Sequence, residues 1–243
     1  MIEIINLFKS FKDKKVLQGV NLTIKKGETI AIIGRSGCGK SVLLKHIVGL
    51  LEPDSGVVKV EGAAIKDLGK KELYEIRRKF GFLFQGAALF DSMTVEENVA
   101  LPLVESGEKL PADKIAALVA EKLDLVGLAN TQKLKPAELS GGMKKRVGLA
   151  RALVTSPEYI LYDEPTTGLD PVMSDSIDEL IRDLSIKLKV TSIVVTHDMF
   201  SVKKTSDRIA MMHNGVIYFS GTQEDFINSK DDVIINFIKR TNF

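Results

Sequence analysis

The sequence predicts an α/β fold with one helical insertion, and three observations predict it. Residues 2–24 contain two apolar runs with partial alternation, which is typical of strands. The continuous apolar run 29–33 leads directly into a glycine-rich loop and then into helical spacing. Residues 86–155 have helical texture with little strand between the helices. We therefore expect a β-rich start, an α/β core and an inserted helical segment.

The N-terminal part alternates strands with helices. A polar turn at 12–15 separates the first two strands, and residues 29–33 are typical of a strand covered on both faces. Apolar residues from Val42 to Leu51 recur at helical spacing, and Pro53 and Gly56 should end that helix. The expected strands are 2–11, 16–24, 29–33, 57–62 and 80–84, and the expected second helix is 68–79.

The rest of the chain, from residue 86, is predicted to be helical at first and then to alternate strands and helices again. The expected helices are 98–106, 112–125, 141–155 and 172–188; the expected strands are 159–162, 191–196, 209–212 and 216–219; and 225–240 should be mostly helical. We expect one domain over 1–243, in which a helical subdomain at 86–155 is inserted between core segments 1–85 and 156–243.

Composition limits the class of protein. With 243 residues, 44% of them hydrophobic, the chain can bury the core of one large domain. The 34 Lys and Arg nearly balance the 32 Asp and Glu, which argues against a nucleic-acid binder. The single cysteine, Cys38, allows no intrachain disulfide, and nothing near the start is typical of a signal peptide. Apolar runs fall short of the roughly 20 residues that cross a bilayer, so we expect a cytoplasmic chain with at most a peripheral membrane role.

The segment from Gly34 to Ser41 fits the phosphate-loop pattern G-x-x-x-x-G-K-[ST], between a predicted strand and a predicted helix. Its backbone N–H groups would hold phosphate oxygens, with Lys40 on the β- and γ-phosphates and the Ser41 hydroxyl on Mg²⁺. We therefore expect a nucleoside triphosphate with Mg²⁺. The expected binding residues here are Gly34, Arg35, Ser36, Gly37, Cys38, Gly39, Lys40, Ser41 and Val42.

Polar residues also follow three other predicted strands. Asp163 and Glu164 end the strand at 159–162, where Asp163 would hold Mg²⁺ and Glu164 would position the attacking water. His197 follows the strand at 191–196 and would hydrogen-bond the γ-phosphate, although a histidine after a strand is more often structural. Gln85 ends the strand at 80–84 and would contact the metal or the water where the helical segment begins.

A second anion-binding helix start is predicted at 139–143. Ser140 would cap the helix, while Gly141 and Gly142 permit close approach of the backbone to an anion. The basic run at 144–146 alone is typical of a solvated helix face. Two phosphate-binding helix starts with one phosphate loop indicate that the second completes a site on another copy.

Taken in order, the phosphate loop, Gln85, the 139–143 segment, Asp163 with Glu164, the turn at 168–170 and His197 closely resemble the ATP-binding subunit of ABC transporters. The resemblance covers essentially the whole chain. It implies a RecA-like P-loop NTPase core with a mainly parallel sheet, an N-terminal antiparallel β subdomain and the inserted α-helical subdomain. It also implies an ATPase that uses ATP and Mg²⁺.

The resemblance further implies a head-to-tail dimer that sandwiches two ATP molecules. Each ATP would lie between one copy's phosphate loop and the other copy's Ser140, Gly141 and Gly142. Asp170 would lie at the dimer seam near the opposing phosphate loop. Phe11 matches the aromatic residue that stacks on adenine, and Val16 would pack beside it.

A narrower resemblance is carried by residues 81–95 and 98–103, which are similar to the Mla/Mkl group, the ATPases of bacterial phospholipid transporters. It implies a lipid cargo, a multi-spanning membrane permease, a lipid-binding MCE-type protein and a place at the cytoplasmic face of the inner membrane. Residues 86–90 would suit a groove for a permease helix, or would be ordinary core of the insertion.

Three alternatives remain open from sequence. The cargo of the transporter could be an amino acid, a metal chelate or a drug, because this subunit does not touch cargo. A soluble ABC protein acting on ribosomes or DNA usually has two ATPase units or a long coiled coil, which this chain lacks. A P-loop kinase or GTPase would have no use for the segment at 139–143.

Overall fold

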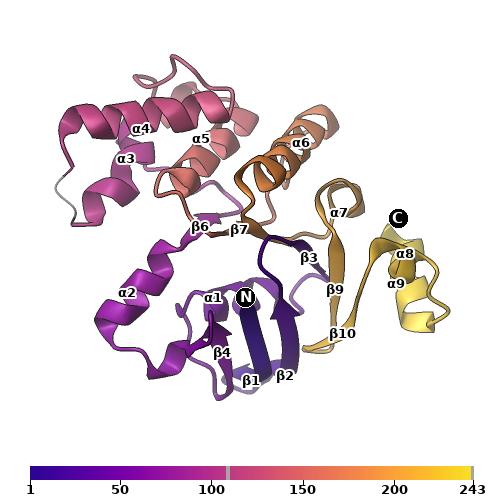
Figure 1. The fold of residues 1–243 in the computed structure, drawn as a ribbon. Helices are drawn as coiled ribbons and strands as arrows, with labels where there is room; N and C mark the ends of the chain where they lie inside the picture. The colour runs from indigo at the N-terminus through magenta and orange to yellow at the C-terminus, as the bar shows by residue number, and fades with distance from the viewer. Residues whose placement is uncertain (108–109, 242–243) are drawn as a thin grey trace.

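The computed structural model describes residues 1–107 and 110–241 of the chain, which form two sheets flanked by helices (Figure 1). Residues 108 and 109 of the predicted helical segment, and residues 242 and 243, lie outside the described residues. The strands are β1 (Ile2–Phe11), β2 (Lys14–Ile24), β3 (Thr29–Ile33), β4 (Ser55–Val60), β5 (Ala63–Ala64), β6 (Phe80–Leu83), β7 (Tyr159–Asp163), β8 (Thr191–Val195), β9 (Arg208–His213) and β10 (Val216–Gly221).

The two sheets have the character that the sequence predicts. The first is antiparallel, in the order β2-β1-β4-β5, and the second has the order β10-β9-β3-β8-β7-β6. In the second sheet every neighbouring pair is parallel except β9 and β10. All five residues of β3 and of β8 are buried, because helices cover both faces of a parallel sheet. The predicted fold class is confirmed.

Three of the helices gather away from the antiparallel sheet (Figure 1). The helices are α1 (Lys40–Ile47), α2 (Lys70–Arg78), α3 (Val95–Glu105), α4 (Ala112–Leu125), α5 (Gly141–Leu153), α6 (Pro171–Leu188), α7 (Met199–Thr205), α8 (Gln223–Ile227) and α9 (Asp232–Thr241), with short 3-10 turns η1 (Ile65–Asp67) and η2 (Pro136–Glu138). Figure 1 shows α3, α4 and α5 together, on the far side of the molecule from β1 and β2. Their apolar core continues onto Ile160, Tyr162 and Val194 of the parallel sheet. The boundaries of a separate subdomain at 86–155 stay a prediction.

Capping residues explain where the helices differ from the prediction. Helix α3 begins at Val95, because the Thr94 hydroxyl accepts a hydrogen bond from Glu97 N and the Glu97 carboxylate accepts one from Thr94 N. Helix α7 was not predicted; Asp198 starts it by accepting from Phe200 N at 2.9 Å.

The C-terminal stretch, predicted as mostly helical, divides into α8 and α9. The carboxylate of Asp231 accepts from Val233 N at 2.8 Å and so starts the second of these helices. The apolar face of α9 buries Ile234 and Phe237 against Met211 and Phe226. The sequence left the partner of this face open, and the structure shows that it packs on the chain's own core.

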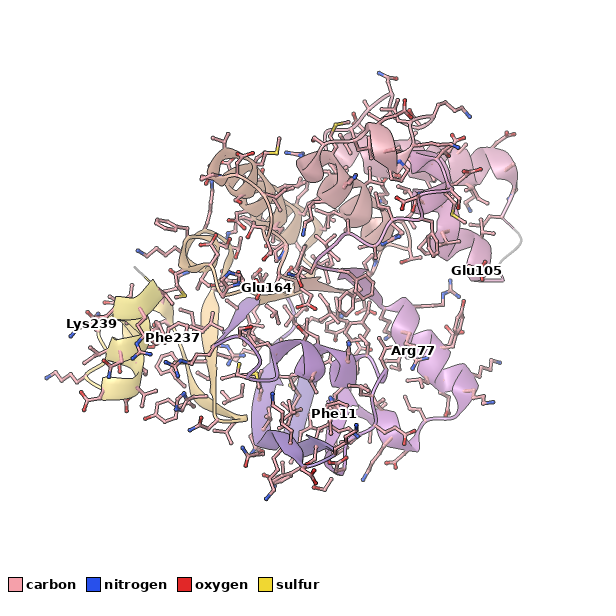
Figure 2. The ribbon with its side chains drawn as sticks, turned by 180° about the vertical axis from the view of Figure 1, so that it is seen from behind. Phe11, Arg77, Glu105, Glu164, Phe237 and Lys239 are labelled. Atoms are coloured by element: carbon pink, nitrogen blue, oxygen red, sulfur yellow. The ribbon has the colours of Figure 1, made fainter. Side chains whose placement is uncertain are left out.

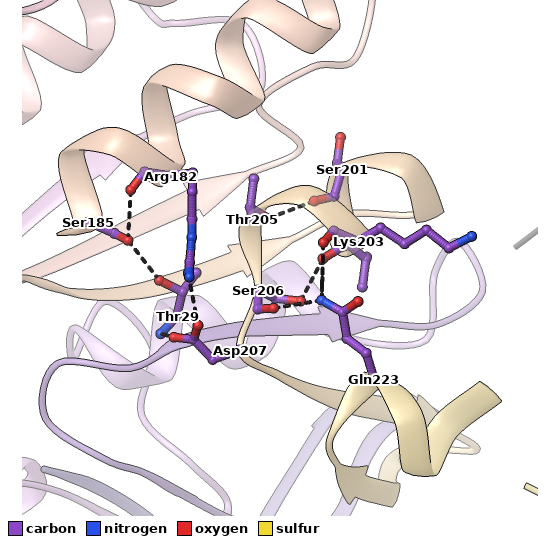
Figure 3. A network of polar contacts seen from close by, with 10 residues as sticks. Thr29, Arg182, Ser185, Ser201, Lys203, Thr205, Ser206, Asp207 and Gln223 are labelled. Carbon is purple, nitrogen blue, oxygen red and sulfur yellow. Dashed lines mark hydrogen bonds and ion pairs between the residues drawn. The ribbon is translucent and has the colours of Figure 1, made fainter. Parts of the chain in front are cut away.

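Polar contacts fix the helices around the start of β3 (Figure 3). The Thr29 hydroxyl donates to Ser185 Oγ at 3.2 Å, and Thr29 N donates to Asp207 Oδ2 at 2.9 Å. The Gln223 amide donates to the carbonyl oxygen of Ser206 at 2.6 Å. These bonds join α6, α8 and the end of α7 to the buried strand from which the phosphate loop continues.

Candidate functional site

The candidate site lies where four neighbouring strands of the parallel sheet end. Strands β3, β8, β7 and β6 are adjacent in that order, and the carboxyl end of a parallel sheet is where such folds bind ligands. A cavity of about 630 Å³ opens there. It is lined by Phe11, Lys14, Val16, Ser36, Gly37, Gly39, Lys40, Ser41, Val42, Gln85, Glu164 and His197. The structure therefore brings together most of the residues that the sequence singled out.

The phosphate loop follows β3 and leads into α1. Lys40 Nζ donates to the carbonyl oxygen of Gly34 at 2.9 Å, so the ammonium group lies over the loop. Gly39, just before the helix, has φ of 107°. A Cβ atom on Gly34 would lie 2.5 Å from the carbonyl oxygen of Met212, and one on Gly39 would lie 2.9 Å from Leu17. These two positions therefore require glycine for both conformation and space.

Ser41 and Asp163 form the predicted metal-binding pair. The Ser41 hydroxyl donates to Asp163 Oδ1 at 2.9 Å, although 122 positions separate the two residues. Burial raises the pKa of the Asp163 carboxyl, and the bond from Ser41 opposes that rise. Hydroxyl and carboxylate oxygens suit Mg²⁺, which usually takes few protein ligands and completes its shell with phosphate and water. Within the described ranges no three His, Cys, Asp or Glu residues gather as a metal cage.

Glu164 and His197 contact each other directly. His197 Nδ1 lies 2.7 Å from Glu164 Oε2, and the Thr167 hydroxyl donates to the same oxygen at 3.2 Å. Glu164 has φ of 51°, a left-handed conformation that costs a non-glycine residue free energy. Its N–H donates to the carbonyl oxygen of Val195 on the neighbouring strand at 2.8 Å, which holds that conformation. Figure 2 shows Glu164 in the middle of the molecule.

Ser140, Gly141, Gly142 and Asp170 do not line this cavity. The Ser140 hydroxyl caps α5 by accepting from its third N–H, and Asp170 caps α6. A Cβ atom on Gly141 would lie 3.2 Å from the Leu169 side chain. The glycine start of α5 and the residues around Asp170 are therefore neighbours on one surface, apart from the phosphate loop of the same chain.

The sequence interpretation of 144–146 as a solvated helix face is wrong for Lys145, which is 5% exposed. Its ammonium group donates to the carbonyl oxygens of Gln85 and, at 3.4 Å, Glu164. Burial lowers the pKa of Lys145, while the nearby carboxylates oppose that effect. Lys145 lies three residues after Gly142 and four before Leu149, both buried, and this helical spacing was the signal that could have found it.

Arg151, on the same helix, holds the segment that follows Gln85. Its guanidinium donates to the carbonyl oxygens of Ala87 at 2.6 Å and Ala88 at 2.7 Å. The groove interpretation of 86–90 is wrong for Ala87, which is buried against Gly148 and belongs to the core. Phe90 is exposed, as a docking residue would have to be.

A phosphate loop at a helix start, with a serine and aspartate pair and a glutamate and histidine pair at the carboxyl edge of a parallel sheet, defines a phosphate-loop nucleoside triphosphatase. The ABC transporter family matches residues 17–167. The chain belongs to this family, which confirms the prediction of an ATPase that uses ATP and Mg²⁺. Membership also rules out the kinase and GTPase alternatives.

Curated relatives cover nearly the whole chain. The probable ribonucleotide transport ATP-binding protein mkl of Mycobacterium tuberculosis is 43% identical over 98% of this chain, which spans only 66% of that relative. The intermembrane phospholipid transport system ATP-binding protein MlaF of Haemophilus influenzae is 41% identical over 98% of this chain and 90% of its own length. The methionine import ATP-binding protein MetN of Carboxydothermus hydrogenoformans is 43% identical over 98% of this chain and 71% of its own length.

A solved structure has the same fold. The dimeric, post-hydrolysis state of the ATP-binding cassette MJ0796, bound to ADP and Pi, is 35% identical and has a TM-score of 0.83. The similarity covers 91% of this chain and 98% of that one. The predicted family and fold are thus confirmed, whereas the names of the relatives point to several different cargoes.

Proposed function

We propose that this chain is the ATP-hydrolysing subunit of a transporter that moves phospholipid or a related lipid. Two copies sandwich two ATP molecules and drive a multi-spanning permease that works with a lipid-binding MCE-type protein. The similarity to MlaF supports this cargo, because it extends over 90% of that relative, and so does the resemblance of residues 81–95 and 98–103 to the Mla/Mkl group.

The observation that carries hydrolysis is the contact between Glu164 and His197 in the cavity that also contains Lys40 and Ser41. A carboxylate in this place is suited to accept the proton of an attacking water. Lys40 holds the β- and γ-phosphates, and the loop's N–H groups hold their oxygens. Ser41, Asp163 and Gln85 would hold Mg²⁺, which would neutralise the charge that develops on the phosphates.

His197 has two roles in this mechanism. In the structure its Nδ1 contacts the carboxylate of Glu164, which also receives the hydroxyl of Thr167. When the γ-phosphate arrives, the exposed imidazole turns to hydrogen-bond it. Oε2 of Glu164 then loses the contact with His197 and gains a lone pair for the water. The pair therefore holds this oxygen of the base until nucleotide is present.

Phe11 and Val16 form the adenine side of the site. Both line the cavity beside the phosphate loop, and Phe11 is exposed on the antiparallel sheet. Its ring offers one face to an adenine, and Lys9 Nζ lies 5.6 Å from the ring centroid. Stacking on an aromatic face is tolerant of the base, so this contact adds affinity more than selectivity.

The second copy completes each site. Ser140, Gly141 and Gly142 present the N-terminus of α5, a 13-residue helix, on a surface away from the chain's own cavity. Such a helix start attracts phosphate through its free N–H groups and its dipole. In the dimer these groups contact the γ-phosphate held by the other copy, and Asp170 lies at the seam.

Closure of the dimer reaches the permease through the segment after Gln85. Lys145 and Arg151 of α5 hold this segment by its carbonyl oxygens, so the two move together. Phe84 and Phe90 are exposed at its ends and supply an apolar contact for a permease helix. Among the helices of the described part, none is long and apolar enough to cross a bilayer. The proposed place is the cytoplasmic face of the inner membrane, on the permease.

The cargo is tested with the complete transporter in proteoliposomes. Phospholipid in the membrane should stimulate ATP hydrolysis, and lipid should co-purify with the complex, as identified by mass spectrometry. Stimulation by methionine or by a ribonucleotide, with none by lipid, would assign the cargo class of the other relatives instead.

A further inference from the structure

A second cavity, of about 490 Å³, lies between the starts of α6 and α7, outside the nucleotide site. Three of the residues that line it are aspartates, Asp175, Asp178 and Asp198. Leu169 and Phe200 form part of its apolar rim. Among the described residues that line it there is no basic side chain. We refer to it as the acidic pocket.

One carboxylate oxygen in the acidic pocket lacks a partner. Asp178 is 3% exposed, and its Oδ2 accepts from the Ser201 hydroxyl at 2.7 Å, whereas its Oδ1 is buried without a hydrogen bond. An unsatisfied buried carboxylate oxygen is costly, and burial with the nearby Asp198 raises the pKa of Asp178 to about 6. The nearest lysine, Lys204, is held by Asp175 and, at 3.0 Å, by Glu179.

The other aspartates are already used. Asp198 accepts from Phe200 N and caps α7, and Asp175 pairs with Lys204. Asp178 Oδ1 therefore remains an acceptor at the acidic pocket for which the described part of the chain supplies no donor. An arginine suits the place, because its fork can pair with carboxylates while its plane lies on an aromatic ring such as Phe200, which is 73% exposed.

The acidic pocket adjoins the surface that receives the second copy under the proposed function, on which this inference rests. Leu169 of its rim contacts Gly141, and Met173 of the same α6 turn lies beside Gly142. A phosphate loop placed on the start of α5 therefore lies next to the acidic pocket. Val172, at 79% exposed, leaves further apolar surface uncovered there.

The phosphate loop carries one exposed cation, Arg35. In the part of the chain that the structure describes, its guanidinium makes no hydrogen bond, whereas its carbonyl oxygen accepts from Lys40 Nζ at 3.4 Å and from Cys38 N at 3.2 Å. We propose that Arg35 of one copy enters the acidic pocket of the other copy and pairs with Asp178 Oδ1 when ATP closes the dimer.

This pairing would connect the two active sites. The Ser201 hydroxyl bonds to Asp178 and lies 3.3 Å from Thr166 Oγ1, and Thr166 is two residues from Glu164. Ser201, which is labelled in Figure 3, belongs to α7. This helix begins two residues after His197. Arrival of Arg35 from one copy thus stabilises the loops that carry the base and the histidine of the other.

The test is a double-mutant cycle on ATP-dependent dimerisation in the Glu164→Gln background, measured by analytical ultracentrifugation at saturating ATP. Arg35→Gln and Asp178→Asn should each weaken the dimer about tenfold, as expected for a buried charge pair, and the double variant should be no weaker than either. Lys15→Gln and Asp175→Asn serve as matched charge controls, with shifts below about threefold.

The pairing would be overturned if the losses of dimer affinity in the two single variants multiplied in the double variant, or if the single variants dimerised like the parent. Neither result would contradict the ATP sandwich. A parent that forms no dimer with ATP would overturn the sandwich and the pairing with it. A second measurement leaves Asp178 intact: in a Cys38→Ser chain, Arg35→Cys with Phe200→Cys should be joined between copies by a bifunctional thiol cross-linker when ATP is added, because an arginine side chain reaches farther than a disulfide allows. A dimer that forms with ATP but is not joined by this cross-linker would also contradict the proposal.

Discussion

The two polar surfaces of this molecule differ in how complete they are. In the nucleotide cavity the chain satisfies its own groups: Ser41 bonds to Asp163, and His197 bonds to Glu164. On the surface around Ser140 and Asp170, the start of α5 is open and the acidic pocket keeps an oxygen without a partner. Folding alone prepares the first surface, whereas the second is prepared for something that the single chain does not contain.

This difference separates the groups that carry out hydrolysis from the groups that control when it occurs. Under the proposed function, the groups that polarise water and hold metal are fixed before any partner arrives, so a monomer should bind nucleotide. The groups proposed to complete the γ-phosphate site belong to another copy, so turnover should require association. The following variants separate these two contributions, and they are ordered from the largest effect to the smallest.

Glu164→Gln should remove only the hydrolytic function of the nucleotide cavity. The amide cannot accept the proton from water, so turnover should fall about 1000-fold while ATP still binds. Steady-state phosphate release and equilibrium binding of ATP measure the two effects separately. Hydrolysis at the parent rate would show that Glu164 is not the base.

Ser140→Arg should disrupt only the surface around Ser140 and Asp170. A long cation at the start of α5 removes the cap and blocks close approach of the other copy's nucleotide, which should lower turnover about 100-fold. ATP binding by the monomer should be unchanged, because Ser140 does not line the cavity. Loss of monomer binding in this variant would contradict the assignment of Ser140 to the partner's site.

Lys145→Met should weaken the connection between helix α5 and the nucleotide cavity. The variant loses the contacts that join α5 to Gln85 and Glu164, and we expect the maximal rate to fall about tenfold with little change in KM for ATP. Lys144→Met, one residue away and without those contacts, is the control. Partial recovery in Lys145→Arg would support positioning, while equal losses at 144 and 145 would oppose it.

Asp178→Asn should stabilise the monomer. The folded pKa of about 6 exceeds the unfolded value, so the native state loses stability as pH rises from about 4 to 6, with Asp198 and Asp175 adding to that loss and Lys204 opposing it. Removing the charge should raise the free energy of unfolding by about 2 kcal/mol at pH 8 and by nearly nothing at pH 4. Denaturant unfolding at the two pH values tests this, and equal differences at both would contradict the buried charge.

Much of this was predictable from sequence because the signals are local. The phosphate loop, the apolar strands and the carboxylates at 163 and 164 are contiguous patterns whose geometry follows from their own spacing. Ser140 was likewise predicted as the cap of its helix, and the structure shows that cap. The four expected strand ends do meet at one edge of the sheet.

The contacts that the sequence did not give are long-range ones. Glu164 and His197 were assigned separate partners, and only the adjacency of β7 and β8 shows that they bond to each other. Lys145 lies in a basic run, where charge alone suggests solvent, and its burial depends on how α5 packs against the segment after Gln85. The local signal that separates it from Lys144 is its helical spacing from Gly142 and Leu149, which are both buried.

The strand order also has a consequence for the newly made protein. Strand β8, which is completed only at residue 195, lies between β3 and β7, and the serine and aspartate pair spans that gap. A nascent chain that has emerged as far as α6 therefore has its phosphate loop but no assembled catalytic edge. Synthesis itself should delay hydrolysis until the last parallel strands have entered the sheet, so a prematurely terminated chain cannot consume ATP.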